Sequence, residues 1–163
     1  MKTFFAVLAT ALTAASYVEA AIPNNTPLHI NSHLDSGLAL TLANNVPTAF
    51  LLVDSPGSST PSDLSLFNLT AGEQYGQIFH DDLCITANGV TPGNALVVDT
   101  CSDDPAQLWW MAESRLTIQN ADNNCITLCD EALRAVVLLE ACNITIADRQ
   151  EWKTFVAITR PDL

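Results

Sequence analysis

The chain has 163 residues and a formal net charge of -12, with 18 acidic and 6 basic side chains. So few basic groups leave no cationic patch, and this disfavours binding to nucleic acids or to anionic membranes. The charge favours solubility, but it does not identify a partner.

Residues 1–20 have the pattern of a secretory signal peptide. Lys2 supplies a positive charge, Phe4–Ala15 is an apolar run too short to span a bilayer, and Val18–Ala20 is a small-residue cleavage site. A buried N-terminal helix is the alternative for this run. We expect a secreted, extracellular protein in which residues 21–163 form a single domain large enough to bury a core. The rest of the sequence holds no apolar stretch near the roughly 20 residues of a membrane span.

Three triplets fit the acceptor pattern for N-glycosylation, and they begin at Asn24, Asn68 and Asn143. Acceptors that are used lie on the surface of secreted proteins. Because the triplet also occurs by chance, these sites are credible mainly because the signal peptide predicts secretion. We therefore expect a glycoprotein.

The five cysteines point to an internal repeat. In a secreted protein disulfides are the expected state, and an odd number leaves one thiol over. Cys84 and Cys101 are 17 residues apart, as are Cys125 and Cys142, and the second pair follows the first by 41 residues. Each first cysteine opens Cys-Ile-Thr, and each second cysteine follows an apolar run and an acid. A Gln-x-Trp comes shortly after each pair, at 107–109 and 150–152.

A third copy lies about 45 residues upstream of the first pair. There Leu38–Thr41 matches Leu83–Thr86, and Phe50–Ser55 matches Ala95–Thr100. The chain thus contains three units, at residues 28–70, 71–112 and 113–157.

The first unit lacks both cysteines, since Ala39 and Pro56 stand in their places, and Phe67 replaces the tryptophan. The cysteines are lost together, as expected if they pair within each unit. Cys129 is the odd thiol. It is a buried small residue, pairs between molecules, or takes the place of Cys125.

Each unit is predicted to form β-strands. Leu96–Val98 and Val137–Leu139 are short apolar runs, and Asn88–Gly89 and Pro92–Asn94 are turn signals. The segment 132–140 also fits a helix, but its register with 96–99 favours a strand. One unit of about 40 residues cannot bury its apolar face alone, so the three units must share a core with their tryptophans pointing inward.

This layout resembles the ricin-type lectin domain, over nearly all of residues 21–163. The likeness is strong in units two and three and weaker in unit one. It implies an all-β fold, a β-trefoil of about twelve strands in which three hairpins cap a six-stranded barrel. It further implies two disulfides within units, Cys84–Cys101 and Cys125–Cys142. Small secreted proteins of this type are familiar in fungi.

The resemblance also implies where a sugar should bind. The family places a carboxylate two residues after the first cysteine, an amide four and an aromatic two residues before the second, and an asparagine before Gln-x-Trp. In this chain those positions hold threonine (Thr41, Thr86, Thr127), aliphatic residues (Leu52, Val97, Leu138), acids (Asp54, Asp99, Glu140), and Ala106 or Arg149. A hydroxyl cannot give the charged, two-point acceptance of a carboxylate. Because only Gln107 and Gln150 match, the usual galactose-type site is predicted to be lost.

Other residues remain candidates for sugar binding. Trp110 follows an inward tryptophan, so it faces outward as a stacking platform or packs on a neighbouring loop. Asp99 and Glu140 lie on pocket rims in the family geometry, where they accept sugar hydroxyls or form part of a solvated acidic surface. The candidate set is Asn88, Asn94, Asp99, Gln107, Trp110, Glu140 and Gln150. Turn chemistry is the alternative role for the asparagines, and unit two is favoured for its turns and Trp110.

The sequence gives no pattern for a metal, cofactor or active site. His29, His33 and His80 lie in no zinc-ligand motif, and the acidic pairs lack a calcium-loop pattern. Acids are too abundant to single out a glycosidase pair. The prediction is a secreted, non-catalytic, lectin-like protein that binds a glycan or glycoprotein. The alternative is a degenerate trefoil without sugar binding that serves as a protein-interaction or inhibitor module.

Overall fold

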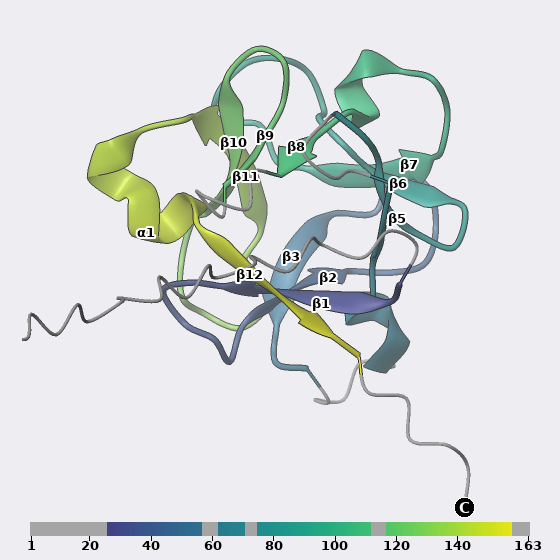
Figure 1. Ribbon diagram of the computed structural model, residues 1–163, viewed down its shortest axis with the longest axis horizontal. Helices are drawn as coiled ribbons and strands as arrows, with labels where there is room; N and C mark the ends of the chain where they lie inside the picture. Colours follow the sequence, from purple (N-terminus) through teal and green to yellow (C-terminus); the bar gives the residue numbers. More distant parts are fainter. Residues whose placement is uncertain (1–25, 57–61, 71–74, 112–116, 158–163) are drawn as a thin grey trace, which may run out of the picture.

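The computed structural model describes residues 26–56, 62–70, 75–111 and 117–157. These residues form twelve β-strands in three four-stranded sheets, as expected for a β-trefoil (Figure 1). The strands are β1 Leu28–Ser32, β2 Ala39–Leu42, β3 Leu51–Asp54, β4 Asn68–Leu69, β5 Ile78–His80, β6 Leu83–Thr86, β7 Val97–Thr100, β8 Trp110–Met111, β9 Ile118–Gln119, β10 Asn124–Leu128, β11 Val137–Ala141 and β12 Trp152–Val156. The short helical segments are η1 Ser62–Ser65, η2 Pro105–Gln107, η3 Ile144–Ile146 and α1 Ala147–Gln150.

Each sheet combines strands from two units. We define unit one as β1–β4, unit two as β5–β8 and unit three as β9–β12. The sheet orders are β12-β1-β2-β3, β4-β5-β6-β7 and β8-β9-β10-β11, so the outer strand of every sheet comes from the preceding unit around the ring. The last strand thus pairs antiparallel with the first, from Leu28 opposite Val156 to Ser32 opposite Trp152, and the two cross the molecule side by side (Figure 1). No unit builds a complete sheet by itself.

A six-stranded barrel closes through two kinds of contact. Neighbouring units are joined by the pairs β12–β1, β4–β5 and β8–β9. Within each unit, a single bridge links the first strand to the last, at Leu28–Phe67, Gly76–Trp109 and Thr117–Glu151. The predicted barrel is therefore confirmed, and each unit contributes to it in the same way.

The other two strands of each unit form the hairpins β2–β3, β6–β7 and β10–β11. Bridges connect every hairpin to the other two, at Phe50–Val97, Leu52–Val136 and Ala95–Leu138. Three mutual contacts of one kind make a triangle, so the predicted threefold pseudosymmetry is confirmed at the level of the backbone. β11 begins at Val137, so the expected strand is present in the second part of the segment 132–140, residues 132–135 form a turn, and none of the segment is helical.

Aromatic residues occupy the same place in each unit and share one core. Phe67, Trp109 and Trp152 are fully buried. The indole Nε1 of Trp109 donates to the Ile85 carbonyl at 2.8 Å, and that of Trp152 donates to the Ile126 carbonyl at 3.0 Å. Each indole can bury about 150–250 Å² of surface, and its one polar group, the N–H, still has a hydrogen-bond acceptor in the core. Aliphatic side chains from all three units pack around them, among them Leu28, Leu40, Leu51, Leu69, Ile78, Leu96, Val98, Ile118 and Leu139.

Both predicted disulfides are present. Cys84 in β6 joins Cys101 just after β7, and Cys125 in β10 joins Cys142 just after β11. Each bridge therefore ties the two ends of one hairpin. Cys129 is free and exposed. The interpretation of it as a buried residue is wrong, and it does not take the place of Cys125.

The predicted turns of unit two lie between β6 and β7. Gly89 and Gly93 both have positive φ, at 91° and 92°, which favours glycine. The Asn94 side chain donates from Nδ2 to the Asn88 carbonyl at 2.9 Å. A Cβ atom on Gly89 would lie 2.9 Å from that same Nδ2, so the close approach also requires glycine. Turn chemistry thus accounts for the two asparagines of this hairpin.

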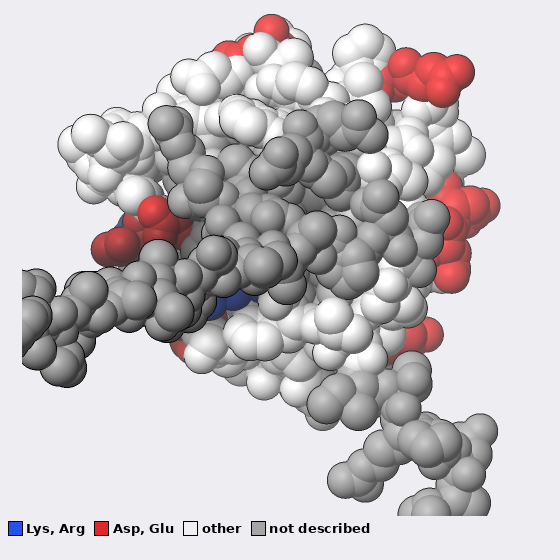
Figure 2. Space-filling model, in the orientation of Figure 1, with Lys and Arg blue, Asp and Glu red and all other residues white. Residues whose placement is uncertain are grey.

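Acidic side chains lie in separate clusters around the edge of the face shown in Figure 2, and little basic surface is visible. Asp54 is buried, and its Oδ2 lies 3.5 Å from the Nη1 of Arg134. Of the expected glycosylation sites, Asn143 is exposed and Asn68 lies half-buried in β4. Asn24 and the expected signal peptide lie outside the described residues. Within the described part, no helix combines the length and hydropathy that a bilayer crossing requires.

Candidate functional site

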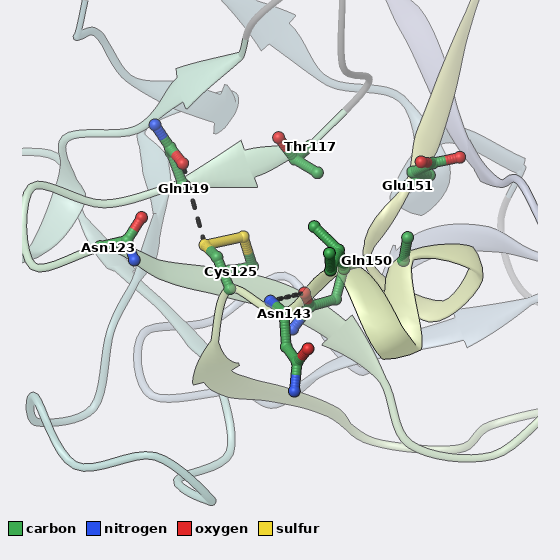
Figure 3. Close-up of a pocket in the computed structure, with 10 residues that line it drawn as sticks. Thr117, Gln119, Asn123, Cys125, Asn143, Gln150 and Glu151 are labelled. Carbon is green, nitrogen blue, oxygen red and sulfur yellow. Dashed lines mark hydrogen bonds between the residues drawn. A yellow bond between two sulfur atoms is a disulfide. The ribbon is translucent and has the colours of Figure 1, made fainter.

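A pocket of about 590 Å³ opens in unit three, between β9, β10 and the segment that contains η3 and α1 (Figure 3). Its polar lining groups come from several of these elements, and the Cys125–Cys142 disulfide faces it as well. The described residues that line it are Thr117, Gln119, Asn123, Cys125, Cys142, Asn143, Ile144, Ala147, Gln150 and Glu151. None of these is aromatic, so a ligand would be held by polar groups and by aliphatic contacts rather than by ring stacking.

Gln150 holds one wall of the pocket in place. Its side chain is 1% exposed. Nε2 donates to Thr127 Oγ1 and to the Ala141 carbonyl, both at 3.0 Å, and Oε1 accepts from the Asn143 backbone N–H at 2.8 Å (Figure 3). These three bonds use both amide hydrogens and the amide oxygen. Gln150 therefore fixes the turn after β11 and has no hydrogen left for a ligand.

η3 forms the outer rim of the pocket. The Asn143 side chain caps this turn, since its Oδ1 accepts from the Thr145 backbone N–H at 2.9 Å. Asn143 itself is exposed, and the next residue, Ile144, is 93% exposed. An isoleucine left in solvent beside a pocket offers an aliphatic contact surface to whatever enters.

Four polar side chains are placed to meet a ligand. Gln119 lies half-buried in β9 and Asn123 is exposed in the turn before β10, while Thr117 and Glu151 are half-buried and paired by their backbones. Gln119 Oε1 lies 3.8 Å from Cys142 Sγ, a contact and not a hydrogen bond, because a disulfide sulfur carries no proton. Together they offer amide donors and acceptors, a hydroxyl and a carboxylate. Convergent polar groups with aliphatic neighbours are the usual make-up of a small-ligand site.

The family's own sugar positions in unit three do not line this pocket. Thr127 is 4% exposed. Arg149, which stands where the family has asparagine, donates from Nη1 to the Cys129 carbonyl at 3.1 Å. Glu140 is half-buried in β11 and does not line the pocket. Of the two unit-three candidates from the sequence, only Gln150 reaches the pocket, and it does so as part of the wall.

The unit-two candidates lie away from this pocket. Gln107 is 2% exposed and repeats the bonds of Gln150: its Nε2 donates to Thr86 Oγ1 and the Thr100 carbonyl, and its Oε1 accepts from the Ser102 N–H. Asp99 is half-buried, and its Oδ1 accepts from the Thr100 N–H at 2.8 Å. Gln107 thus belongs to the core, while Asp99 keeps a carboxylate oxygen for other contacts.

Trp110 is half-buried in β8 and lies beside the exposed ring of Tyr75. The two ring centroids are 6.4 Å apart and the planes are tilted by 46°. Trp109 faces the core, so the alternation along the strand that was expected from the sequence is present. The pair of rings leaves Trp110 as a candidate stacking surface in unit two.

Sequence reasoning did not find Thr117, Gln119, Asn123 or Glu151. The strand register contains the signal that was missed. Gln119 lies opposite Cys125 in unit three, where unit two places Phe79 opposite Cys84. Unit one also has an amide here, Asn31 opposite Ala39, but only unit three combines the amide with a disulfide.

Residues 28–153 match the family model of the ricin-type beta-trefoil lectin domain. The chain belongs to this family. No curated protein sequence matches it. The family supports a carbohydrate-binding role, and domains of this family are generally non-catalytic.

Solved structures share the fold at low sequence identity. The chain is similar to a mosquitocidal holotoxin (TM-score 0.71, 12% identity, 83% of this chain and 18% of that one). It is also similar to a Polyporus squamosus lectin bound to the epitope Neu5Aca2-6Galb1-4GlcNAc (TM-score 0.66, 14% identity, 82% of this chain and 49% of that one). A third similar structure is the C-half of an earthworm R-type lectin in complex with GalNAc (TM-score 0.62, 13% identity, 81% of this chain and 99% of that one). The chain thus spans about half of the Polyporus lectin and less than a fifth of the holotoxin.

Proposed function

We propose that this is a secreted, non-catalytic lectin that binds a carbohydrate in the pocket of unit three. The observation that carries the proposal is the pocket itself, in which amide, hydroxyl and carboxylate groups converge beside aliphatic side chains. Sugar hydroxyls need paired donors and acceptors, and the C–H faces of a sugar ring need apolar contact. Both kinds of group are present at one place.

Each lining group has a role in this proposal. Glu151 accepts hydrogen bonds from two adjacent hydroxyls, since a charged acceptor forms the stronger bonds. The amides of Gln119 and Asn123 donate and accept at the other side, and Ile144 and Ala147 contact the ring carbons. The family's carboxylate position holds Thr127, so Glu151 takes over its chemistry from a different strand.

The charge of the protein favours neutral sugars. A net charge of -12 repels anionic ligands, and Glu151 places a carboxylate at the pocket. Sialylated or sulfated glycans should therefore bind less well than neutral ones. This distinguishes the chain from the Polyporus squamosus lectin, whose solved complex contains a sialylated epitope.

A glycan array with the secreted full-length protein tests the proposal. We expect binding to neutral glycans that Asn123→Ala and Gln119→Ala each weaken several-fold. Asn88→Ala, in a turn of unit two, is the matched control and should leave binding unchanged. Loss of binding in Trp110→Ala, with Asn123→Ala unaffected, would move the site to unit two. Absence of binding across all neutral sugar classes would contradict a lectin function.

The second candidate is a protein-interaction or inhibitor module. It is favoured by one observation: two of the family's sugar positions in unit three have other roles, since Thr127 is buried and Arg149 donates to the Cys129 carbonyl. A trefoil that has lost its usual sites keeps a rigid scaffold with loops free for a protein partner. Inhibition of a panel of secreted proteases, with no signal on the glycan array, would support this function.

A further inference from the structure

A histidine and two carboxylates meet at the edge of the pocket. His33 follows β1, Asp148 lies in α1, and Glu151 directly precedes β12. Each residue offers one ligand atom, and all three atoms lie within 4.8 Å of one another. The sequence predicted no metal site, because spacing motifs cannot reveal ligands that come from opposite ends of the chain.

The backbone holds two of these residues together. The His33 N–H donates to the Glu151 carbonyl at 2.9 Å, which extends the pairing of β1 with β12 by one step beyond Ser32 and Trp152. Both of those neighbours are buried, at 1% and 0% exposure. The two side chains therefore start from a rigid stretch of backbone that places them next to each other.

The third ligand is fixed by its own anchor. Asp148 is exposed, but it lies two residues before Gln150, whose side chain makes three hydrogen bonds in the core. α1 is thus held against β10, and Asp148 is carried to the same edge as His33. Pre-organised ligands lose little side-chain entropy on binding an ion.

The atoms suit a small divalent cation. His33 Nε2 lies 3.7 Å from Glu151 Oε2. Ligands about 2.1 Å from a zinc ion and at the tetrahedral angle are about 3.4 Å apart, so this pair needs only a small adjustment. The carboxylate of Asp148 lies within 4.8 Å of both atoms and is exposed, so it can turn toward the ion. The other ring nitrogen, Nδ1, is buried with no partner among the described residues. Nε2 is therefore the nitrogen that an ion can reach, and it is the one that faces the carboxylate.

We propose that His33, Asp148 and Glu151 bind a zinc-type divalent cation, with water completing the coordination. A neutral imidazole with two carboxylates is a donor set that suits zinc better than calcium, which prefers oxygen ligands alone. The strongly negative protein adds a general attraction for cations. This inference does not rest on sugar binding.

Titration of the metal-free, full-length protein with ZnCl₂ by isothermal calorimetry tests the site. We expect one ion per chain and a rise in the melting temperature, since the ion binds the folded state. His33→Gln and Asp148→Asn should each weaken binding about tenfold or more. Neither residue lines the sugar pocket, but the third ligand, Glu151, does, so the titration is carried out in the absence of sugar. CaCl₂ in place of ZnCl₂ should give much weaker heats.

The matched control is Asp81→Asn. His80 Nε2 lies 3.5 Å from Asp81 Oδ2, a second histidine–carboxylate pair, but among the described residues no third ligand lies close enough to complete a metal site there. Asn tolerates the positive φ of 51° at this position, so the variant should fold. Zinc affinity should be the same as in the unsubstituted protein. A loss of affinity there, equal affinity in His33→Gln, or no bound zinc would each overturn the proposal.

Nuclear magnetic resonance of the histidine rings provides a second test that needs no substitution. On adding zinc to the unsubstituted protein, the Nε2 signal of His33 should shift while those of His29 and His80 stay in place. A shift at His80 in preference to His33 would show that the ion binds elsewhere.

Discussion

Gln150 donates from Nε2 to the hydroxyl of Thr127 at 3.0 Å, and this bond has a counterpart in unit two between Gln107 and Thr86 at 3.2 Å. Each threonine then donates its own hydroxyl hydrogen to the carbonyl two residues earlier, at 3.0 Å to Cys125 and at 2.9 Å in unit two. The position must accept and donate at once. A carboxylate cannot donate, so the threonines mark a family sugar position that serves the core in this chain.

Thr127→Val should destabilise the protein by about 1–3 kcal/mol, because it leaves a buried amide hydrogen of Gln150 and the Cys125 carbonyl short of a partner. Urea denaturation followed by circular dichroism measures the change. Thr100→Val, at an exposed position of β7, removes the same hydroxyl from the surface and should change stability by no more than about 0.5 kcal/mol. Equal losses of stability in the two variants would show that the hydrogen bonds of the Thr127 hydroxyl contribute nothing to the free energy of unfolding.

Trp109→Ala and Trp152→Ala should each lower the free energy of unfolding by about 3–5 kcal/mol, because a fully buried indole leaves a cavity. Phe155→Ala, at an aromatic position that is 48% exposed in β12, should cost about 1 kcal/mol or less. The same denaturation curves give both values. If either tryptophan variant were as stable as the unsubstituted protein, the shared aromatic core would be the wrong description.

Replacing both Cys125 and Cys142 by serine should cost about 3 kcal/mol, the chain-entropy value for a disulfide that closes a loop of this length. The same change also removes the disulfide that lines the pocket, so sugar binding should weaken with it. Cys129→Ser is the control, and its stability should stay within about 0.5 kcal/mol because this thiol is free and exposed. Peptide mass mapping of the unsubstituted protein should find Cys129 outside both bridges.

Asn143 joins two of the proposals, because it lines the pocket and begins a glycosylation triplet. A glycan attached there would stand at the pocket rim and compete with ligand. Protein from a glycosylating host should therefore bind neutral sugars more weakly than Asn143→Gln protein from the same host. In a host that does not glycosylate, the two should bind alike. A difference between them there would mean that the Asn143 side chain acts directly, as the cap of η3 or as a ligand contact.

The repeated features were predictable because the same interaction recurs in each unit. Trp109 and Trp152 follow their cysteines at nearly the same distance, and one shared role explains the spacing. The pocket has no such recurrence. It depends on a single replacement, Gln119 in place of Phe79, and on how η3 and α1 lie against β9. Contacts made once, by segments without a period, leave no pattern in one sequence.

The same limit applies to His33 and Glu151, which meet only because the first strand pairs with the last. Glu151 is the variable residue of the Gln-x-Trp motif at 150–152, and His33 lies in no motif, so nothing in the local sequence links the two. The pairing of β1 with β12 follows from the fold and not from the local sequence. Knowledge of the trefoil ring was needed before the two could be placed together.

The pairing of β1 with β12 has a consequence for how the protein is made. While the chain is being synthesised, β1 can pair with β2 as soon as both are made, but its other edge waits for residues 152–156 of β12, the last strand of the fold. An unpaired strand edge is a template for other chains. Products that stop short of Trp152 should therefore aggregate rather than persist as smaller folded lectins, because the barrel closes only after residues 152–156 have been made.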